Sequence, residues 1–466
     1  MSARRFTRRE VVRGALAAGA ALSLPAARAL ASGEAEPPAW LAGGPLPWRN
    51  WSGFQHCAPA ARLGPATESE VAKLLADGTG VVRPAGAGHS FSGLVPSDGA
   101  LLFLDNLTGV VSTDAPSLQA EVWAGTRLAL LGPALAANGQ AMPNLPDIDY
   151  QTLGGAIATS THGTGALLGS LSSCVVGLSL ATPRGEVLEC DAVRNAEVFH
   201  AARTSLGALG VVTRFRLQNR EAFKVVEKTQ WRELDDVFAN LDRDRSENRC
   251  FEFYAFPHAD VALAIATNET DAEPYAIGAD DPGGLDLLAK AFGVTRWLPG
   301  IGTPLYEMVL RNSGTTEHAD WSWRVLAHPR TTRFNEMEYT VPADAGPECL
   351  REILRTIRER DLPVCFPIEC RWVREDDVWL SMFYARPGFS ISVHQFADRD
   401  FRPYFDVIEP IFWKYDGRPH WGKLHGLNAP RLAALYPRWR DFEQVRRSLD
   451  PNGRLVNAHL ATLLGV

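Results

Sequence analysis

Two glycine-rich segments constrain what this chain can fold into. The first, residues 83–92, directly follows a short β run and alternates Gly86 and Gly88 with alanine before His89. Small residues let the backbone pass close to a ligand and turn its N–H groups toward an anion, as phosphate-binding nests do. The spacing is not that of a GxGxxG fingerprint opening a helix. Taken alone, the segment also fits a tight turn that ends in a surface histidine.

The second segment, residues 153–165, combines glycines and hydroxyl side chains with very little bulk. This composition predicts a backbone threaded between a ligand and another element of the fold. An ordinary Gly/Thr loop is the alternative for this segment in isolation. Its place downstream of the first glycine-rich segment favours a site that the two share.

Short β runs alternate with helical stretches from about residue 50 to about residue 220, which predicts an α+β domain. Strands are expected at 81–83, 101–104 and 119–123, helices at 68–76 and 128–137, and a hairpin at 172–182 and 187–190. From about residue 221 to residue 416 the pattern changes and predicts a second domain. It has aromatic strands at 250–256, 379–384 and 390–396, a helix at 348–360 and a loop-rich stretch at 271–302.

Charge and cysteine content exclude several classes of protein. The net charge is −7 over 466 residues, and no run of Lys and Arg follows the first 13 residues, so we expect no nucleic-acid partner. Seven scattered cysteines without a CxxC pair do not form a disulfide framework or a zinc site. Cys365 and Cys370 could form one local bridge, and buried free thiols are the simpler interpretation.

The first residues have the features of an export signal. Arg8 and Arg9 precede an apolar stretch, residues 14–27, that is shorter than the roughly 20 residues needed to span a bilayer. Residues 29–31 then end in a small-x-small pattern. This predicts a twin-arginine signal peptide at 1–31, a linker at 32–48, recognition by the twin-arginine export machinery and a periplasmic or otherwise exported location. An amphipathic N-terminal helix is the alternative.

Two further segments carry charged side chains with a regular spacing. Residues 367–372 predict a strand, and alternation then places Glu369 and Arg371 on the same face, able to form an ion pair beside a cavity. A surface cross-strand pair would have the same pattern. Residues 418–425 contain His420, Lys423 and His425. No carboxylate or cysteine completes a ligand set nearby in the sequence, so we predict no metal.

In this order, the four segments resemble the vanillyl-alcohol-oxidase type of FAD enzymes, and within it the branch of aldonolactone oxidases, with alditol oxidases as relatives. The motifs are Gly88-His89-Ser90, Thr161-His162-Gly163-Thr164-Gly165, Glu369-x-Arg371 and His420-Trp421-x-Lys423-x-His425. The resemblance implies an α+β, two-domain FAD-binding fold (PCMH type) with an α+β cap. The FAD-binding domain would span 49–220 and the substrate (cap) domain 221–416, with a C-terminal segment, 417–466, that returns to the FAD domain.

The resemblance also implies residue roles. His89 would bond the flavin covalently, and Glu369, Arg371 and Lys423 would be catalytic and contact the substrate together with Asp147 and His425. Contacts to FAD would come from Pro84, Ala85, Gly86, Ala87, Gly88, His89, Ser90, Asp147, Thr152, Gly155, Ala156, Ile157, Ala158, Val211 and His420.

These roles agree with the chemistry of oxidising a carbinol carbon, which needs a positioned base and a fixed cation. Arg371 and Lys423 are the cations, and Glu369 would hold Arg371. Pro146 stands where a Gly or Pro accompanies oxygen reactivity in the wider family and is assigned as the oxygen gate, so we expect an oxidase whose partners are a small carbohydrate-derived substrate and O2. Asp147 replaces the serine of alditol oxidases, Phe396 replaces their threonine, and His425 matches lactone oxidases.

The expected function is therefore oxidation of a sugar-derived lactone, with hydride transfer to FAD and reoxidation by O2 to H2O2. An alditol or other carbohydrate oxidase, a dehydrogenase with another acceptor, and a non-catalytic FAD- or sugar-binding protein are the alternatives. A hydrolase lacks support because no GxSxG elbow occurs.

Overall fold

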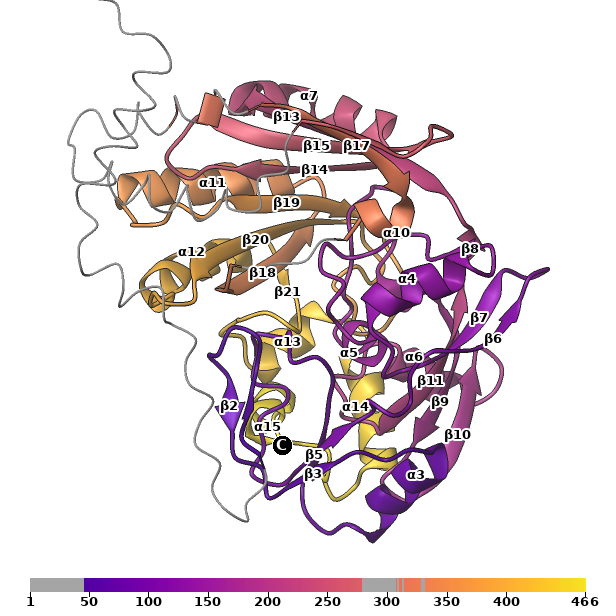
Figure 1. Ribbon diagram of the computed structural model, residues 1–466. Coiled ribbons are helices and arrows are strands. Elements are labelled where there is room, and N and C mark those ends of the chain that lie inside the picture. The colour runs from indigo at the N-terminus through magenta and orange to yellow at the C-terminus, as the bar shows by residue number, and fades with distance from the viewer. Residues whose placement is uncertain (1–45, 279–306, 308–309, 312–313, 328–331) are drawn as a thin grey trace, which may run out of the picture. The chain divides into compact units, whose positions relative to one another are not determined.

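The computed structural model describes residues 46–278, 307, 310–311, 314–327 and 332–466 (Figure 1). Residues Trp48–Val466 form one compact unit. The predicted signal peptide, nearly all of the predicted linker and residues 279–302 of the predicted loop-rich stretch lie outside the described residues. None of the described helices has the length and apolar character needed to cross a bilayer.

Two sheets belong to the half of the molecule that contains the glycine-rich segments, and the first segment begins in one of them. A parallel sheet has the order β3-β5-β4, and an antiparallel sheet has the order β10-β9-β11-β7-β6. Helix α3 begins at Glu68, where the N-cap Thr67 accepts a hydrogen bond from the Glu70 N–H, and its apolar face packs between the sheets. The bounds are Ala61–Leu63 (β3), Glu68–Asp77 (α3), Val82–Ala85 (β4), Ala100–Phe103 (β5), Val110–Asp114 (β6), Gln119–Trp123 (β7), Val175–Ala181 (β9), Val187–Asp191 (β10) and Val211–Gln218 (β11).

The expected helices and strands of this part agree with the structure to within about a residue or two, with one exception. Residues 172–174 begin the predicted hairpin but lie in a 3₁₀ helix, η1 (Leu171–Cys174), that precedes β9. Shorter elements complete this half of the molecule: Trp48–Arg49 (β1), His56–Cys57 (β2), Leu128–Ala136 (α4), Gln140–Ala141 (β8), Leu153–Ala158 (α5), Ala196–Ala202 (α6) and Arg220–Glu221 (β12).

The largest sheet among the described residues has nine strands in the order β16-β17-β13-β15-β14-β19-β20-β18-β21. Helices α7, α11 and α12 lie along it (Figure 1). The bounds are Lys224–Glu233 (β13), Leu234–Glu247 (α7), Cys250–Ala255 (β14), Val261–Thr270 (β15), Tyr275–Ile277 (β16), Thr316–Trp321 (β17), Ser322–Val325 (α10), Phe334–Pro342 (β18), Gly346–Glu359 (α11), Ile368–Val373 (β19), Gly388–Phe396 (β20), Arg402–Lys414 (α12) and Arg418–Pro419 (β21).

Alternation along the central strands divides this sheet into an apolar and a polar face. In β19, Ile368, Cys370 and Trp372 belong to the hydrophobic core, whereas Glu369 and Arg371 point to the opposite face and bond each other. In β18, Glu336 and Glu338 are on the polar face in the same way. The prediction that Glu369 and Arg371 share one face is confirmed.

The strand predicted at residues 379–384 is wrong. These residues form turns, with an isolated bridge between Asp376 and Tyr384. The run is apolar because Trp379 and Phe383 are buried in the core, so its pattern cannot be told from that of a buried strand. The Asp376 carboxylate holds the turn by accepting hydrogen bonds from the Ser170 and Ser381 hydroxyls and the Val378 N–H.

The C-terminal residues pack on the half of the molecule that contains the glycine-rich segments. After β21, helices α13 (Ala429–Leu435), α14 (Trp439–Leu449) and α15 (Ala458–Leu464) follow. The Val82 N–H donates to the Arg454 carbonyl at 2.8 Å, and Asn457 Nδ2 donates to the Pro96 carbonyl at 2.8 Å. The end of the chain therefore helps to hold β4 and the loop that follows it.

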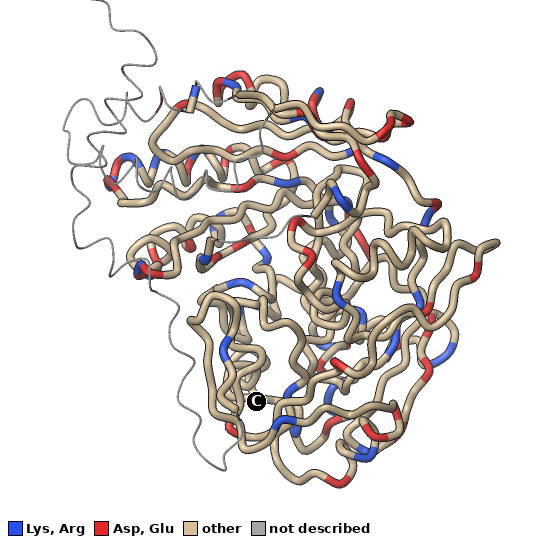
Figure 2. The backbone as a smooth tube through the Cα atoms, in the orientation of Figure 1, with Lys and Arg blue, Asp and Glu red and all other residues tan. Residues whose placement is uncertain are grey.

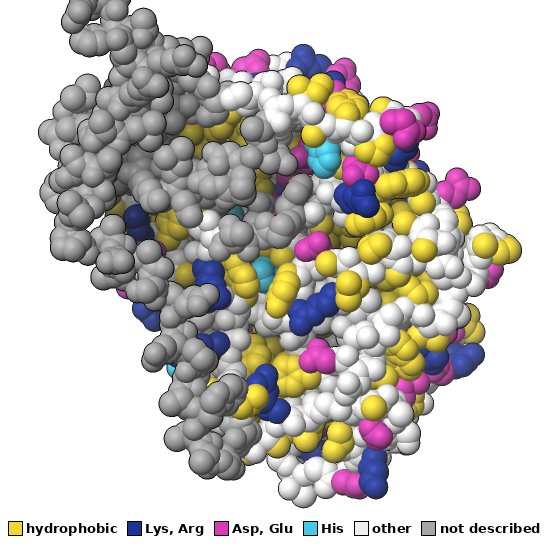
Figure 3. Space-filling view, in the orientation of Figure 1, with side chains coloured by type: hydrophobic (Ala, Val, Ile, Leu, Met, Phe, Trp, Pro, Cys, Tyr) yellow, Lys and Arg dark blue, Asp and Glu magenta, His cyan; other side chains and the backbone are white. Residues whose placement is uncertain are grey.

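Charges are mixed along the backbone, and basic and acidic side chains are interspersed on the face drawn in Figure 3 (Figures 2 and 3). All seven cysteines lie in the described part of the chain and are free thiols, five of them buried. The bridge considered for Cys365 and Cys370 is not formed.

Candidate active site

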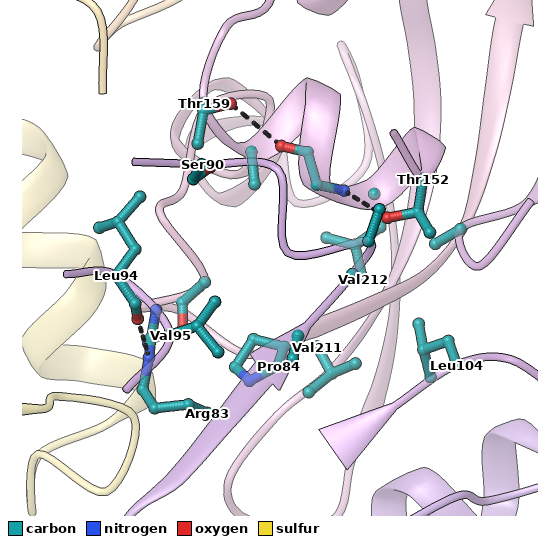
Figure 4. Close-up of a pocket in the computed structure, with 18 of the residues that line it drawn as sticks. Arg83, Pro84, Ser90, Leu94, Val95, Leu104, Thr152, Thr159, Val211 and Val212 are labelled. Carbon is teal, nitrogen blue, oxygen red and sulfur yellow. Dashed lines mark hydrogen bonds between the residues drawn. The ribbon is translucent and has the colours of Figure 1, made fainter. Parts of the chain in front are cut away.

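A large pocket opens at the end of β4, between the two glycine-rich segments. The space between its walls is about 1110 Å³, including the part open to solvent. Figure 4 shows residues from β4, β11 and the α5 region lining one cavity. Eleven of the residues predicted to contact FAD line it: Pro84, Ala85, Gly86, Ala87, Gly88, His89, Ser90, Thr152, Gly155, Ala158 and Val211.

The glycines of the first segment are required by the packing. A β-carbon on Gly86 would lie 2.2 Å from Thr152 Oγ1, and Gly88 adopts φ +70°, which side chains other than glycine rarely accept. The backbone can therefore run along the pocket wall at close range. This cradle fits an extended dinucleotide better than a compact ligand, because the wall extends from β4 to β11.

His89 is buried in this pocket and unusually poor in partners. It is 7% exposed, and within the described residues neither ring nitrogen has a hydrogen-bond partner. Its ring lies 4.7 Å from that of Trp51 and 6.4 Å from that of Tyr150, centroid to centroid. Burial, and then the charge of Lys423, lower the pKa of His89 to about 4. A buried neutral imidazole without a partner is what a bond to a ligand would satisfy.

Arg83 also lines the pocket, and the sequence did not single it out. Its guanidinium is buried and donates to the carbonyls of Leu94 at 2.8 Å and of Leu206 and Gly207, both at 2.7 Å, and also to the carbonyl of Leu455. One side chain thus joins distant segments of the wall. Burial lowers its pKa to about 9.

Four residues predicted to contact FAD are not on this pocket's wall: Asp147, Ala156, Ile157 and His420. Ala156 and Ile157 are fully buried on the core side of α5, because residues one and two positions after Gly155 point away from the face that lines the pocket. Asp147 and His420 lie instead among the charged groups described next.

A cluster of charged groups surrounds Arg371 on the polar face of the large sheet. Its Nη2 bonds Glu369 Oε1 and lies 3.8 Å from Asp147 Oδ2, and its Nε donates to Glu252 Oε2 at 2.9 Å. Tyr254 donates to Glu369 Oε1 at 2.5 Å. Burial would lower the pKa of Arg371, but Glu369 and Glu252 hold it well above its ordinary value. The guanidinium stays charged.

Lys423 belongs to a second cluster on the same face. Its ammonium bonds Glu336 Oε2, and His394 Nε2 lies 3.6 Å from Glu336 Oε1. Burial would raise the pKa of Glu336, but Lys423 and His394 hold it well below the ordinary range, so the carboxylate is ionised. Glu336 therefore fixes the cation that the sequence assigns to the substrate.

His420 lies beside a third buried group. Its ring is 5.8 Å from that of His162, whose Nε2 bonds Glu338 Oε1 at 2.6 Å. His420 Nδ1 accepts a hydrogen bond from the Gly422 N–H at 3.0 Å, which fixes the ring. Burial lowers the pKa of His420 to about 3. His420 is neutral near pH 7.

His425 has its contacts elsewhere. Its ring packs against Trp421 at 6.2 Å and His459 at 6.5 Å, and its Nδ1 accepts a hydrogen bond from the Leu427 N–H. No described contact joins it to Arg371, Glu369 or Lys423. The substrate contact predicted for His425 stays a prediction.

Pro146 lies buried in the loop that also carries Asp147. This loop packs on the second glycine-rich segment: Asn144 Nδ2 donates to the Thr164 carbonyl at 3.0 Å, and a β-carbon on Gly163 would lie 2.2 Å from the Leu145 carbonyl oxygen. The close approach explains why residue 163 is glycine. It also holds the loop of Pro146 against the second glycine-rich segment.

The pocket and the polar face meet at His89. Lys423 Nζ lies 5.1 Å from the centroid of the Phe91 ring, and that ring is 6.2 Å from His89. The charges of Lys423, Glu336 and Asp147 all act on the His89 imidazole. A ligand that fills the pocket up to His89 therefore ends beside the charged side chains.

Several site residues were missed by the sequence analysis, namely Glu252, Tyr254, Glu336, Glu338 and His394. The alternation of charged and apolar residues in 334–342 is a signal that could have indicated the two glutamates. Groups of His and Glu also come together as His162, Glu338 and His420, and as Glu336, Glu369 and His394. Ion pairs and hydrogen bonds among these side chains and Lys423 account for both groups.

Comparison with known proteins agrees with this geometry. Residues 59–191 match the FAD binding domain family, and residues 215–463 match the D-arabinono-1,4-lactone oxidase family. Cholesterol oxidase from B. sterolicum has the same fold, with a TM-score of 0.74 at 17% identity over 90% of this chain and 96% of that one. The predicted fold class, an α+β FAD-binding fold of the vanillyl-alcohol-oxidase type, is confirmed, and the fold and pocket define an FAD-dependent oxidoreductase.

Relatives cover nearly the whole chain. L-gulono-1,4-lactone dehydrogenase of Mycobacterium tuberculosis is 37% identical over 90% of this chain and 99% of its own length. L-gulonolactone oxidase of Bos taurus is 31% identical over 89% of this chain and 97% of its own length. Alditol oxidase of a Streptomyces species is 28% identical over 89% of this chain and 98% of its own length. The chain belongs to the D-arabinono-1,4-lactone oxidase family.

Proposed function

We propose that this enzyme oxidises a carbinol carbon of a sugar-derived lactone and that His89 holds its FAD covalently. The observation that carries the proposal is the meeting of His89, buried without a partner, with the charged side chains of the large sheet. FAD, when bound, accepts a hydride from the carbinol carbon and passes the electrons to an acceptor. The cradle around Gly86 and the unpartnered imidazole fit that group.

The chain's own residues supply binding and electrostatics. Arg371 and Glu369 offer a donor and an acceptor to substrate hydroxyls, and Lys423 places a fixed ammonium beside the pocket. Neutral His420 uses Nδ1 to accept from the Gly422 N–H, so its Nε2–H is a further hydrogen-bond donor. Glu369 and Glu336 keep the two cations in place.

A substrate panel tests the proposal directly. Aldonolactones, alditols and free sugars would be mixed anaerobically with the enzyme while the flavin absorbance is followed, and H2O2 would be measured in air. We expect bleaching by aldonolactones at lower concentration than by alditols. Preference for an alditol would support the alternative substrate class, and absence of bleaching by all of them would contradict the proposal.

We further propose that O2 is the acceptor and that Pro146 permits its access. Pro146→Ala restores an N–H to the loop and changes its preferred path. Reoxidation by O2 should slow by about tenfold, equal to about 1.4 kcal/mol of barrier, while anaerobic reduction by substrate stays within a few-fold. Stopped-flow measurement of the two half-reactions checks this. Equal losses in both would show that the loop is merely distorted, and a wild type inert to O2 would identify a dehydrogenase, like the mycobacterial relative.

We also propose export of the folded protein by the twin-arginine route, which is supported by Arg8, Arg9 and the apolar stretch that follows. Replacing both arginines with lysine should leave the protein in the cytoplasm at its full length, because the export machinery reads the arginine pair. Cell fractionation followed by mass spectrometry of the N-terminus is the measurement. Unchanged delivery to the periplasm would refute the assignment.

A further inference from the structure

The strand next to the Glu369-x-Arg371 motif carries a second pair with the same spacing. Strand β14 pairs with β19 so that Glu252 lies opposite Arg371 and Tyr254 lies opposite Glu369. Each opposite pair bonds: Arg371 Nε donates to Glu252 Oε2 at 2.9 Å, and Tyr254 donates to Glu369 Oε1 at 2.5 Å. Both members of the motif are therefore supported from one neighbouring strand.

These bonds divide the polar atoms of the motif into two sets. Arg371 uses Nε for Glu252, and it uses Nη2 for Glu369 and Asp147. Glu369 uses Oε1 for both Tyr254 and Arg371. Among the described residues, Arg371 Nη1 and Glu369 Oε2 make no hydrogen bond. One donor and one acceptor are left over on two side chains that bond each other.

We propose that Glu252 and Tyr254 are positioning residues, which aim one guanidinium nitrogen of Arg371 and one carboxylate oxygen of Glu369 at two neighbouring hydroxyls of an uncharged substrate. The inference rests on the proposed function. A hydroxyl both donates and accepts, so a fixed donor beside a fixed acceptor matches a pair of hydroxyls. Fixing the side chains in advance removes the cost of ordering them when the substrate binds.

The charged groups around Glu252 make its protonation state, and with it the stability of the protein, depend on pH near neutrality. Glu252 faces Arg371 and Glu369 on β19, Asp147 in the loop after β8, Glu227 on β13 and Tyr254 on its own strand. Burial, together with Glu369, Asp147 and Glu227, raises the pKa of Glu252 from 4.5 to about 7, against the effect of Arg371. Between these values the folded chain binds a proton that the unfolded chain has lost. Stability therefore falls as the pH rises through this window.

Four variants test the proposal. Glu252→Gln keeps an acceptor for Arg371 Nε but cannot ionise, Glu252→Ala removes the acceptor, and Tyr254→Phe removes only the hydroxyl. Tyr275→Phe is the matched control, because Tyr275 makes an equally short bond, 2.5 Å to Glu317, elsewhere in the sheet. Kinetics from pH 5.5 to pH 8.5 and the Tm of each variant are the measurements.

We expect Glu252→Ala and Tyr254→Phe to raise KM by about tenfold or more, the scale of one hydrogen bond to a charged group, with kcat within a few-fold of wild type. Glu252→Gln should have a KM closer to that of the wild type than Glu252→Ala has. The wild-type KM should change near pH 7, where Glu252 loses its proton, and the KM of Glu252→Gln should not. Its Tm should gain on that of the wild type as the pH rises, and Tyr275→Phe should leave KM unchanged.

The outcomes separate this inference from the proposed function. A wild type that oxidises no member of the substrate panel would contradict the function itself. If the wild type is active and Glu252→Ala has the same KM, the inference alone is overturned. It is also overturned if the difference in Tm between Glu252→Gln and the wild type does not change with pH. A fall in kcat with unchanged KM would do the same, since it would show that the pair does not act on substrate binding.

Discussion

Replacing His89 with alanine is expected to release all flavin from the denatured protein. The wild-type imidazole is buried, neutral and without a partner among the described residues, so one ring nitrogen has a lone pair available for a bond to the cofactor. Alanine has no such nitrogen. After acid precipitation, flavin absorbance should be found in the pellet for the wild type and in the supernatant for His89→Ala.

His56→Ala is the matched control, because His56 is an exposed histidine close in sequence to the pocket. It should keep its flavin in the pellet. If wild-type protein loses its flavin to the supernatant, covalent attachment is refuted. If His89→Ala keeps it in the pellet, another residue is the attachment point.

Replacing Arg371 with alanine is the second large effect, and we expect kcat/KM to fall by about 10²- to 10³-fold, the range for removal of one fixed electrostatic donor. In the proposed role the substrate would lose its cationic partner, and the carboxylates of Asp147, Glu252 and Glu369 would lose the charge that they surround. Removing one partner of a buried ion pair typically costs about 3–5 kcal/mol of stability. Steady-state kinetics and thermal unfolding would be measured together.

Arg371→Lys should recover little, because one ammonium cannot bond Glu252 and Glu369 through two separate nitrogens in a fixed plane, as the guanidinium does. Arg351→Ala, an exposed arginine on α11 that pairs with Glu348, is the control and should change neither rate nor Tm noticeably. An Arg371→Ala enzyme with wild-type kcat/KM would remove Arg371 from the site.

The sequence predicted those parts of the site that depend on local periodicity. The shared face of Glu369 and Arg371 follows from strand alternation alone, and the close approach at Gly86 and Gly88 follows from the lack of side chains. The partner of Lys423 could not be predicted in this way, since Glu336 is 87 positions distant and meets it only through the pairing of β18 with β20 and β21. The same holds for Glu252 and Tyr254, whose role depends on the register between β14 and β19.

The errors also have physical causes. Ala156 and Ile157 lie in a motif that touches the pocket, but only one side of α5 faces it. Residues 379–384 are as apolar as a buried strand but form a buried turn, which Asp376 stabilises through three hydrogen bonds. In both cases tertiary packing determines the structure: which side of α5 faces the pocket, and whether residues 379–384 form a strand or a turn. Composition alone does not predict either.

The contacts of Arg83 bear on the order in which the protein is made. Its guanidinium joins the loop after β4 to Leu206 and Gly207 and to Leu455, which is 372 positions farther along the chain. On a ribosome that has not yet released Leu455 from its exit tunnel, Arg83 therefore lacks one of the four carbonyls that hold it. The last support of this pocket side chain arrives only when Leu455 has emerged, so we expect capture of the cofactor to become stable after that point of synthesis. Ribosome-bound chains stalled before Leu455 should consequently retain less flavin than released chains.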